Sequence, residues 1–386
     1  MKRKAAAIIC AATVAASLLA GSTAAFAADR VIGINNWFEG AYALDILCNN
    51  AKFAVEENGD QLQIFNDEGN AEKIITDVEN MISSGVDGIL WMGMFENNFV
   101  VGPQIPNEAG KYFAFYDKIP SNEDLKNQII GMEYFAGGVS NDNFAAGESM
   151  AQAALADGCT KALIASAEIG DPNSDARVKG FTDTFTAGGG EIMSTSRVAT
   201  SEANGPQQAC DNMLAAFPES DCFYTTGEDF TLAALSVVGK TNSDHEIKIY
   251  GTDLNPTLLE YLKDGSLRAC CGANWTSALY TAIMLENALD GKKMTDENGS
   301  AVIIEDAKMI SVPSEYADMY QRFFIDENPY EQEEIDKMLY VNNPDVTLDD
   351  LKTMISNYSL DERLMAKYNA GKVTKEELEA HGIEVE

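Results

Sequence analysis

Polar and aromatic side chains recur directly after the apolar, strand-like runs of this sequence, where they could surround one small ligand. A carboxylate accepts hydrogen bonds from hydroxyl groups, and an amide both donates and accepts them. Each such bond contributes about 1.5–3 kcal/mol when one partner is charged. A flat ring adds an apolar face, so the set suits a small polyhydroxylated molecule. The side chains are those of Asn36, Trp37, Phe38, Asp117, Lys118, Asp171, Asn173, Glu228, Asp253 and Asn274.

The sequence lacks the patterns that indicate catalysis or metal binding. Its two histidines, His245 and His381, lie in an expected loop and near the C-terminus, so neither looks like a general base. There is no phosphate-binding loop or nucleophile elbow, and no dinucleotide fingerprint follows the first strand. The segment DPNSD at 171–175 lacks the glycine and the distal glutamate of a calcium loop. We expect no catalytic residue, no metal and no cofactor, while the abundant carboxylates leave the acid pair of an enzyme open.

Short apolar runs alternate with amphipathic helical segments along most of the chain. Continuous apolar strands separated by helices indicate parallel sheets that are covered on both faces. The series is interrupted near 133–142, so we predict two doubly wound, Rossmann-like α/β domains. In such sheets, ligands bind beyond the carboxyl ends of the strands. Strands are predicted at 31–35, 62–66, 88–93, 112–117, 128–132, 161–167, 191–196, 222–226, 247–253 and 267–271, and helices at 71–84, 143–157, 175–187, 206–216, 229–240 and 276–290.

The first 27 residues have the pattern of a secretory signal peptide. Basic residues at 2–4 precede an alanine-rich apolar stretch, and Ala-Phe-Ala at 25–27 supplies a small-x-small cleavage site. Ser22 stands where a lipid-anchored protein would carry cysteine. We expect export to the periplasm or the outer face of a bacterial membrane, without a lipid anchor.

The chain is strongly acidic. It carries 27 Lys and Arg residues against 61 Asp and Glu residues, a net charge of −34, and the signal peptide takes away three of the basic residues. Phosphate groups would repel such a chain at long range. We therefore expect no nucleic-acid partner, no anionic membrane partner, and a monomer.

Six cysteines remain after the signal peptide, with spacings that match no zinc motif. Scattered cysteines in a large chain do not make a disulfide scaffold, even in an oxidising compartment. We expect buried free thiols, with Cys210–Cys222 as the remaining candidate for a bridge.

From about Asp326 the sequence becomes acidic and helical in pattern. TLDDLKTMISNYS and TKEELEAHGIE each open on a threonine that can cap a helix, with acids in the first turn. We predict a packed or partly mobile helical appendage that carries no chemistry.

Several segments, taken in order over about 31–312, resemble the type I periplasmic binding proteins of ABC transporters, the ribose- and galactose-binding class. No single segment is decisive, but their order makes the resemblance specific. The segments are SSGVDGILWMG (83–93), FAFYDKIP (113–120), VSNDNFAAGESMAQ (139–152), DPNSDARVKGF (171–181) and IYGTDLNPTLLEYLKDGSLRA (249–269).

The resemblance implies two lobes joined by a three-stranded hinge, with a ligand that is buried when the lobes close. An ABC-transporter permease would then recognise the closed form. The implied division is an N-terminal lobe of 28–141 plus 275–309, a C-terminal lobe of 142–274 plus 310–326, crossings near 139–143, 272–276 and 308–312, and an acidic helical C-terminal extension of 327–386 that the resemblance does not cover.

The resemblance also implies roles for individual residues. Asp117 and Lys118 resemble the family pair that holds sugar hydroxyls, Arg177 its binding arginine and Asp253 its second-lobe aspartate. Asp171 and Asn173 stand at the places of a hydroxyl-binding pair, and Trp37 or Phe38 at that of a stacking ring, with Trp37 preferred beside Asn36. Against these roles, Arg177 could pair with an acid on its own helix, Asp253 could cap a helix, and Lys118 could be a solvated loop residue.

The second lobe departs from the family pattern. Gly227-Glu228 replaces an Asn-Asp pair, and 197–208 contains no aromatic residue. At the last strand Ala273 aligns with the family's polar residue, and Asn274 is one step away. The resemblance therefore implies neither ribose nor glucose.

Other functions remain open beside sugar capture for transport. A sensory receptor for a sugar, nucleoside or quorum-type furanose would use the same closure to signal to a membrane partner. An exported carbohydrate-active enzyme is a further alternative. A transcriptional regulator of this fold would need an N-terminal DNA-binding helix pair in place of the signal peptide.

Overall fold

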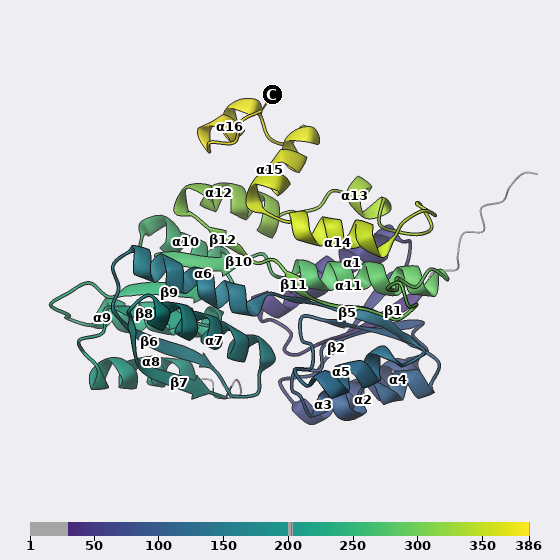
Figure 1. Cartoon of the computed structure of the whole chain (residues 1–386), viewed down its shortest axis with the longest axis horizontal. Helices are drawn as coiled ribbons and strands as arrows, with labels where there is room; N and C mark the ends of the chain where they lie inside the picture. Colours follow the sequence, from purple (N-terminus) through teal and green to yellow (C-terminus); the bar gives the residue numbers. More distant parts are fainter. Residues whose placement is uncertain (1–29, 200–201, 203, 386) are drawn as a thin grey trace, which may run out of the picture.

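The computed structural model describes residues 30–199, 202 and 204–385, so the predicted signal peptide at 1–27 lies outside the described residues (Figure 1). Within this part of the chain, the strands form two six-stranded sheets. We call each sheet with its helices a lobe. The prediction of two parallel-sheet α/β domains is confirmed.

The first lobe contains a sheet in the order β11-β5-β4-β3-β1-β2, and its described strand pairs are parallel. Its strands are β1 (Val31–Asn36), β2 (Gln61–Asn66), β3 (Gly88–Trp91), β4 (Tyr112–Tyr116), β5 (Phe135–Asn141) and β11 (Ile303–Ala307). Its helices are α1 (Tyr42–Glu57), α2 (Ala71–Ser84), α3 (Asn98–Val101), α4 (Gln104–Glu108), α5 (Glu123–Ile130) and α11 (Thr276–Leu289).

The second lobe repeats this topology in the order β12-β10-β9-β8-β6-β7, with only β12 antiparallel among its described pairs. Its strands are β6 (Lys161–Ala167), β7 (Glu191–Val198), β8 (Cys222–Thr225), β9 (Lys248–Thr252), β10 (Ala269–Gly272) and β12 (Ile310–Val312). Its helices are α6 (Asn143–Ala156), α7 (Pro172–Ala187), α8 (Gly205–Ala216), α9 (Glu228–Lys240) and α10 (Pro256–Asp264).

The chain passes between the two sheets after β5, after β10 and between β11 and β12. These passages fall within the predicted crossings near 139–143, 272–276 and 308–312. The exact domain boundaries stay a prediction.

One predicted strand is wrong. Residues 128–132 belong to the end of α5 and the turn after it, and the fifth strand is Phe135–Asn141, within the expected interruption. Gly137 and Gly138 made this segment look like a loop. In the structure the strand is buried along its whole length, and Gly137 lies against Met284 of α11, where a Cβ would come within 2.2 Å of the methyl carbon. Glycine is therefore required there for close packing.

The chain after β12, which we call the C-terminal region (residues 313–385), lies along one side of both lobes (Figure 1). It contains η1 (Ser314–Tyr316), α12 (Ala317–Tyr320), the π-helix η2 (Gln321–Ile325), α13 (Gln332–Asp336), α14 (Leu348–Asn357), α15 (Leu360–Asn369) and α16 (Lys375–Ala380). Thr347 and Thr374 cap α14 and α16, so these predicted helix starts are confirmed.

Helix α11 explains why the C-terminal region packs where it does. Every residue of α11 except Leu289 is buried, so the helix is covered on every side. Helix α1 and strands β4 and β5 cover part of its surface. The C-terminal region covers more: the Tyr280 and Tyr330 hydroxyls lie 2.6 Å apart, and Asn287 Nδ2 donates to the Met338 carbonyl at 2.7 Å.

All six described cysteines are buried free thiols, as the sequence analysis expected. The Cys210–Cys222 alternative is not formed, and the thiol near Cys222 is that of Cys159. Together with Asp221, these two thiols are the one group of three or more Cys, His, Asp or Glu side chains in the described chain that lie close enough to share a metal ion. Asp221 already accepts the backbone N–H groups of Thr160 and Lys161, at 2.8 and 2.9 Å. No helix of the described residues is long and apolar enough to span a bilayer.

Candidate functional site

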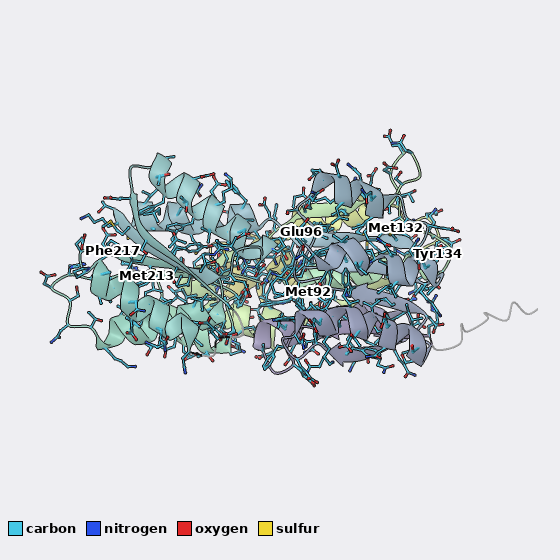
Figure 2. All side chains as sticks on the ribbon, turned by 90° about the horizontal axis from the view of Figure 1, so that it is seen from below. Met92, Glu96, Met132, Tyr134, Met213 and Phe217 are labelled. Atoms are coloured by element: carbon cyan, nitrogen blue, oxygen red, sulfur yellow. The ribbon has the colours of Figure 1, made fainter. Side chains whose placement is uncertain are left out.

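The carboxyl ends of the parallel strands in both sheets face the junction between the lobes. Met92 and Glu96, which follow β3, lie near the middle of the molecule in Figure 2. Tyr134 precedes β5 and Phe217 precedes β8, and these two lie toward opposite outer ends. The side chains that the sequence placed after strands are therefore brought to one place.

The backbone is strained at these strand ends. Among the described non-glycine residues, positive φ angles occur only in the short segments that follow strands. They include 60° at Asp117, 68° at Asp253 and 59° at Ala273. Side chains with a Cβ rarely adopt this region, and such strain gathers where a side chain must be held in a set direction.

Two pairs of side chains join the lobes directly. Asn173 of α7 donates from Nδ2 to Asp117 Oδ2 at 3.0 Å, and the Lys118 ammonium forms a salt bridge with Asp171. All four side chains are buried. Asp171 also caps α7 by accepting the backbone N–H of Asn173, so the helix start fixes both second-lobe partners. The alternative that Lys118 is a solvated loop residue is wrong.

Arg177 connects several segments of the second lobe. Its Nε donates to Asn143 Oδ1 at 2.8 Å, and its Nη1 donates to the Thr226 carbonyl at 2.7 Å and to Asp253 Oδ2 at 3.2 Å. These partners come from α6 and from the ends of β8 and β9. Arg177 therefore pairs with Asp253 on another element and not with an acid on its own helix.

Two glycines allow α6 and α7 to bring Arg177 and Asn143 together. A Cβ on Gly147 would lie 2.1 Å from the Arg177 carbonyl oxygen, and one on Gly180 would lie 2.1 Å from that of Phe144. Real side chains do not fit at such distances. Glycine at these two positions therefore lets the backbones of α6 and α7 contact each other.

Glu228 and Asn274 lie beside the same group. Asn274 Nδ2 donates to Asp253 Oδ1 at 3.4 Å, while its buried Oδ1 has no partner. The Tyr42 hydroxyl and Asn141 Oδ1 are also buried without partners. Buried polar atoms are rarely left unpaired, so these atoms suit hydrogen bonds from a ligand.

The charges of Lys118 and Arg177 oppose the effect of burial on the pKa of Asp117 and Asp171, whereas charge and burial act together on Glu228. Burial raises the pKa of Asp117, although Lys118 and Arg177 oppose it. Burial would also raise the pKa of Asp171, but Lys118 and Arg177 outweigh it and lower that pKa. Burial, with the nearby charges of Asp229 and Asp253, raises the pKa of Glu228 to about 7. Two neighbouring carboxyls, Asp117 and Asp171, are thus pushed in opposite directions.

We expected Trp37 to be the exposed ring after the first strand, and this expectation is wrong. Trp37 is 7% exposed and packs edge-on against Phe95 with ring centroids 5.6 Å apart, whereas Phe38 is 52% exposed. Asn36 is buried, with Nδ2 donating to Asp45 Oδ1 at 2.9 Å and Oδ1 accepting the Phe38 N–H at 3.1 Å. Its amide thus braces the turn, and Phe38 is the ring that is available at the surface.

Sequence reasoning missed several polar residues near this site. Asn143 stands in the quoted segment VSNDNFAAGESMAQ, so its helix-start position was a usable signal. Tyr42 and Thr226 carried no such signal in the sequence. Tyr42 is the first residue of a helix, and Thr226 contributes its backbone carbonyl to Arg177. Two described cavities, of about 320 and 470 Å³, lie at α8–α9 and between α1 and residues 324–328. Tyr42 lines the second of these cavities.

Comparison with solved structures shows the fold. The chain is similar to a glucose-galactose binding protein from Geobacillus stearothermophilus, at 18% identity and a TM-score of 0.61, over 75% of this chain and 99% of that one. It is similar to an ABC transporter solute binding protein from Bacillus halodurans with bound myo-inositol, at 16% identity and a TM-score of 0.64, over 76% and 98%. A periplasmic solute binding protein from Actinobacillus succinogenes with bound D-allose matches at 18% identity and a TM-score of 0.65, over 76% and 100%.

None of the curated proteins matches the chain. The family described as the periplasmic binding protein domain matches residues 32–293, which is more than half of the sequence. This confirms the resemblance found in the sequence segments. The chain belongs to the periplasmic binding protein family.

Proposed function

We propose that this protein is an extracytoplasmic receptor that captures a sugar or sugar derivative between its lobes and delivers it to an ABC-transporter permease. The observation that carries the proposal is the buried polar group contributed by both lobes, with Asp117 and Lys118 on one side and Asp171, Asn173 and Arg177 on the other. The proteins of similar fold named above, which bind sugars or a polyol, support the ligand class.

The chemistry of the group suits hydroxyl ligands. Carboxylates accept O–H donors, Lys118 and Arg177 donate to hydroxyl or ring oxygens, and the unpaired Asn274 oxygen accepts one more bond. A few such bonds, together with one apolar face, reach micromolar affinity, about −8 kcal/mol. The proposal assigns no turnover to the protein, because Asp117, Asp171 and Asp253 serve to bind and orient.

Binding and closure are linked in this proposal. In the structure Asp117 and Lys118 bond to second-lobe side chains, so a ligand that enters between the lobes replaces those bonds with its own hydroxyls. A ligand favours the closed form only by as much as it binds that form better than the open one. Contacts from both lobes meet this condition.

The test is a thermal-shift screen of the mature protein with D-galactose, D-allose and myo-inositol, alongside nucleosides, amino acids and furanose sugars. A ligand at a hundredfold excess over its Kd adds about 2.7 kcal/mol of stability. In calorimetry with the sugar that gives the largest shift, Asp117→Ala and Asp253→Ala should each weaken binding. Glu219→Gln, at an exposed position, should not.

Different outcomes contradict different parts of the proposal. A shift only with amino acids or purines would remove the carbohydrate ligand and leave the receptor. Consumption of a sugar during the screen would point to the enzyme alternative. Failure of the ligand-loaded protein to stimulate ATP hydrolysis by its reconstituted permease would separate sensing from transport.

A further inference from the structure

The C-terminal region contacts both lobes as well as the passage between them. In the second lobe, Lys263 of α10 pairs with Asp318 at 2.8 Å. In the first lobe, Asn328 donates from Nδ2 to Asn50 Oδ1 of α1 at 3.1 Å. The family match ends at residue 293, before this region begins. The C-terminal region therefore lies outside the residues that the family model matches.

Two tyrosines of the C-terminal region hold backbone carbonyls at the strand ends of the second lobe. The Tyr320 hydroxyl donates to the Leu254 carbonyl at 3.4 Å, and the Tyr358 hydroxyl donates to the Ala273 carbonyl at 3.2 Å. Both tyrosines are fully buried. A Cβ on Gly272 would lie 2.4 Å from the Tyr320 hydroxyl, so glycine at that position makes room for the contact.

Each held carbonyl is next to a residue of the candidate site. Leu254 follows Asp253, and Ala273 precedes Asn274. Asp253 and Ala273 are strained, with φ angles of 68° and 59°. Such conformations persist only where surrounding contacts fix them. Asp253 and Asn274 then bond to each other at 3.4 Å, so the two tyrosines act on one pair of ligand-facing side chains.

We propose that Tyr320 and Tyr358 are positioning residues of the ligand site, through which the C-terminal region sets the directions of Asp253 and Asn274. This inference rests on the proposed function, because it concerns the same site. It assigns the C-terminal region a part in ligand affinity, whereas the sequence analysis expected an appendage without chemistry. The tyrosines touch no ligand themselves and act through two stretches of backbone.

The test compares three Tyr→Phe variants that each keep the ring and lose one hydroxyl. Tyr320→Phe and Tyr358→Phe remove the bonds to the strand ends. Tyr330→Phe is the matched control, because Tyr330 is equally buried in the same region but its hydroxyl meets Tyr280 of α11. The probe is whichever of D-galactose, D-allose and myo-inositol gives the largest thermal shift with the unmodified chain.

We expect all three variants to lower the melting midpoint by similar amounts. Affinity for the probe should fall by about fivefold or more in Tyr320→Phe and Tyr358→Phe, as the loss of one orienting hydrogen bond implies, and stay within about twofold in Tyr330→Phe. Equal affinity losses in all three variants would show a merely structural role and overturn the inference. Unchanged affinity in both strand-end variants would overturn it too.

A second readout needs no ligand. Amide hydrogen exchange in the ligand-free protein should become faster at residues 272–276 in Tyr358→Phe and at residues 253–255 in Tyr320→Phe, but at neither stretch in Tyr330→Phe. Faster exchange there without binding of any sugar would support the positioning role and contradict the proposed function. Unchanged exchange would overturn the positioning role whether or not a sugar binds. If Tyr358→Phe does not fold, Tyr320→Phe carries the same comparison.

Discussion

Arg177 is the residue on which the second-lobe part of the site depends. Its guanidinium bonds to a side chain, a backbone carbonyl and the Asp253 carboxylate, and it is buried. Burial would lower the pKa of Arg177, but Asp253 and nearby acids outweigh it and raise that pKa. The arginine therefore stays charged, and Asp253 relies on it for compensation.

Replacing Arg177 should cost both stability and binding. Arg177→Met leaves Asp253 without its cation, and breaking a buried pair costs about 3–5 kcal/mol. Urea unfolding and calorimetry with the probe sugar measure the two effects. Lys179→Met is the control on the same helix, because Lys179 forms a surface pair with Asp183. Equal losses in the two variants would contradict the role given to Arg177.

Glu228 should make stability depend on pH. Its folded pKa of about 7 lies above the ordinary value of 4.5, so the folded chain binds a proton more tightly than the unfolded chain does. Stability is therefore present below the unfolded pKa and declines as pH rises through the folded one. The melting midpoint of Glu228→Gln, relative to that of the unmodified chain, should be higher at about pH 8 than at about pH 5. Glu219→Gln should show no such change, and a pH-independent difference for Glu228→Gln would contradict the raised pKa.

At the scale of elements, the contact between α6 and α7 decides whether Arg177 reaches its partners. Both helices carry a glycine where the other helix's backbone passes, and the close approach depends on both. The ends of β8 and β9 then place Thr226 and Asp253 within hydrogen-bond distance of Arg177. The site is thus assembled by helix packing as much as by the sheet.

Gly180→Ala should separate the two helices and weaken ligand binding. The added methyl would stand 2.1 Å from the Phe144 carbonyl oxygen, and backbone must move to admit it. Overpacking of this kind costs about 1–3 kcal/mol. Gly239→Ala in α9 is the control, because its Cβ would meet nothing within 4 Å and alanine favours helix by about 0.5–1 kcal/mol. A stable Gly180→Ala variant with full affinity would show that the helices are free to shift.

At the scale of the molecule, the lobes are held together by polar bonds across their junction and by the C-terminal region beside it. Lys118 and Asn173 bond across the junction to Asp171 and Asp117. These bonds favour a compact arrangement of the two lobes.

Lys118→Met should shift the ligand-free protein toward a more open form. The change removes one bond across the junction and leaves Asp171 buried without its cation, which opening relieves through solvation. Small-angle scattering should show a larger radius of gyration. Lys126→Met is the control, because Lys126 pairs with Glu305 inside the first lobe. No expansion in Lys118→Met would contradict a role for this bond in closure.

The sequence predicted those features of the fold and the site whose cause lies within a short stretch of the chain. Apolar periodicity predicted α2 at its observed bounds, and strand-end position placed Asp117 and Asp253 at the junction. Trp37 packs against Phe95, which is distant in sequence, so no local pattern could show that Trp37 is buried and Phe38 exposed. Tyr358 meets Ala273 across 85 residues, a contact that only the packed chain defines.

The return of the chain to the first sheet also bears on the order in which the protein folds. Strand β11 pairs with β5, and α11 packs on β4 and β5, although most of the second lobe lies between them in sequence. Residues 143–272, in contrast, supply five of the six second-lobe strands from one continuous stretch. During synthesis from the N-terminus, the second lobe can therefore assemble most of its sheet while the first still lacks an edge strand and a buried helix. Local contacts form faster than those that close long loops. The first lobe should therefore reach its native packing after the second lobe.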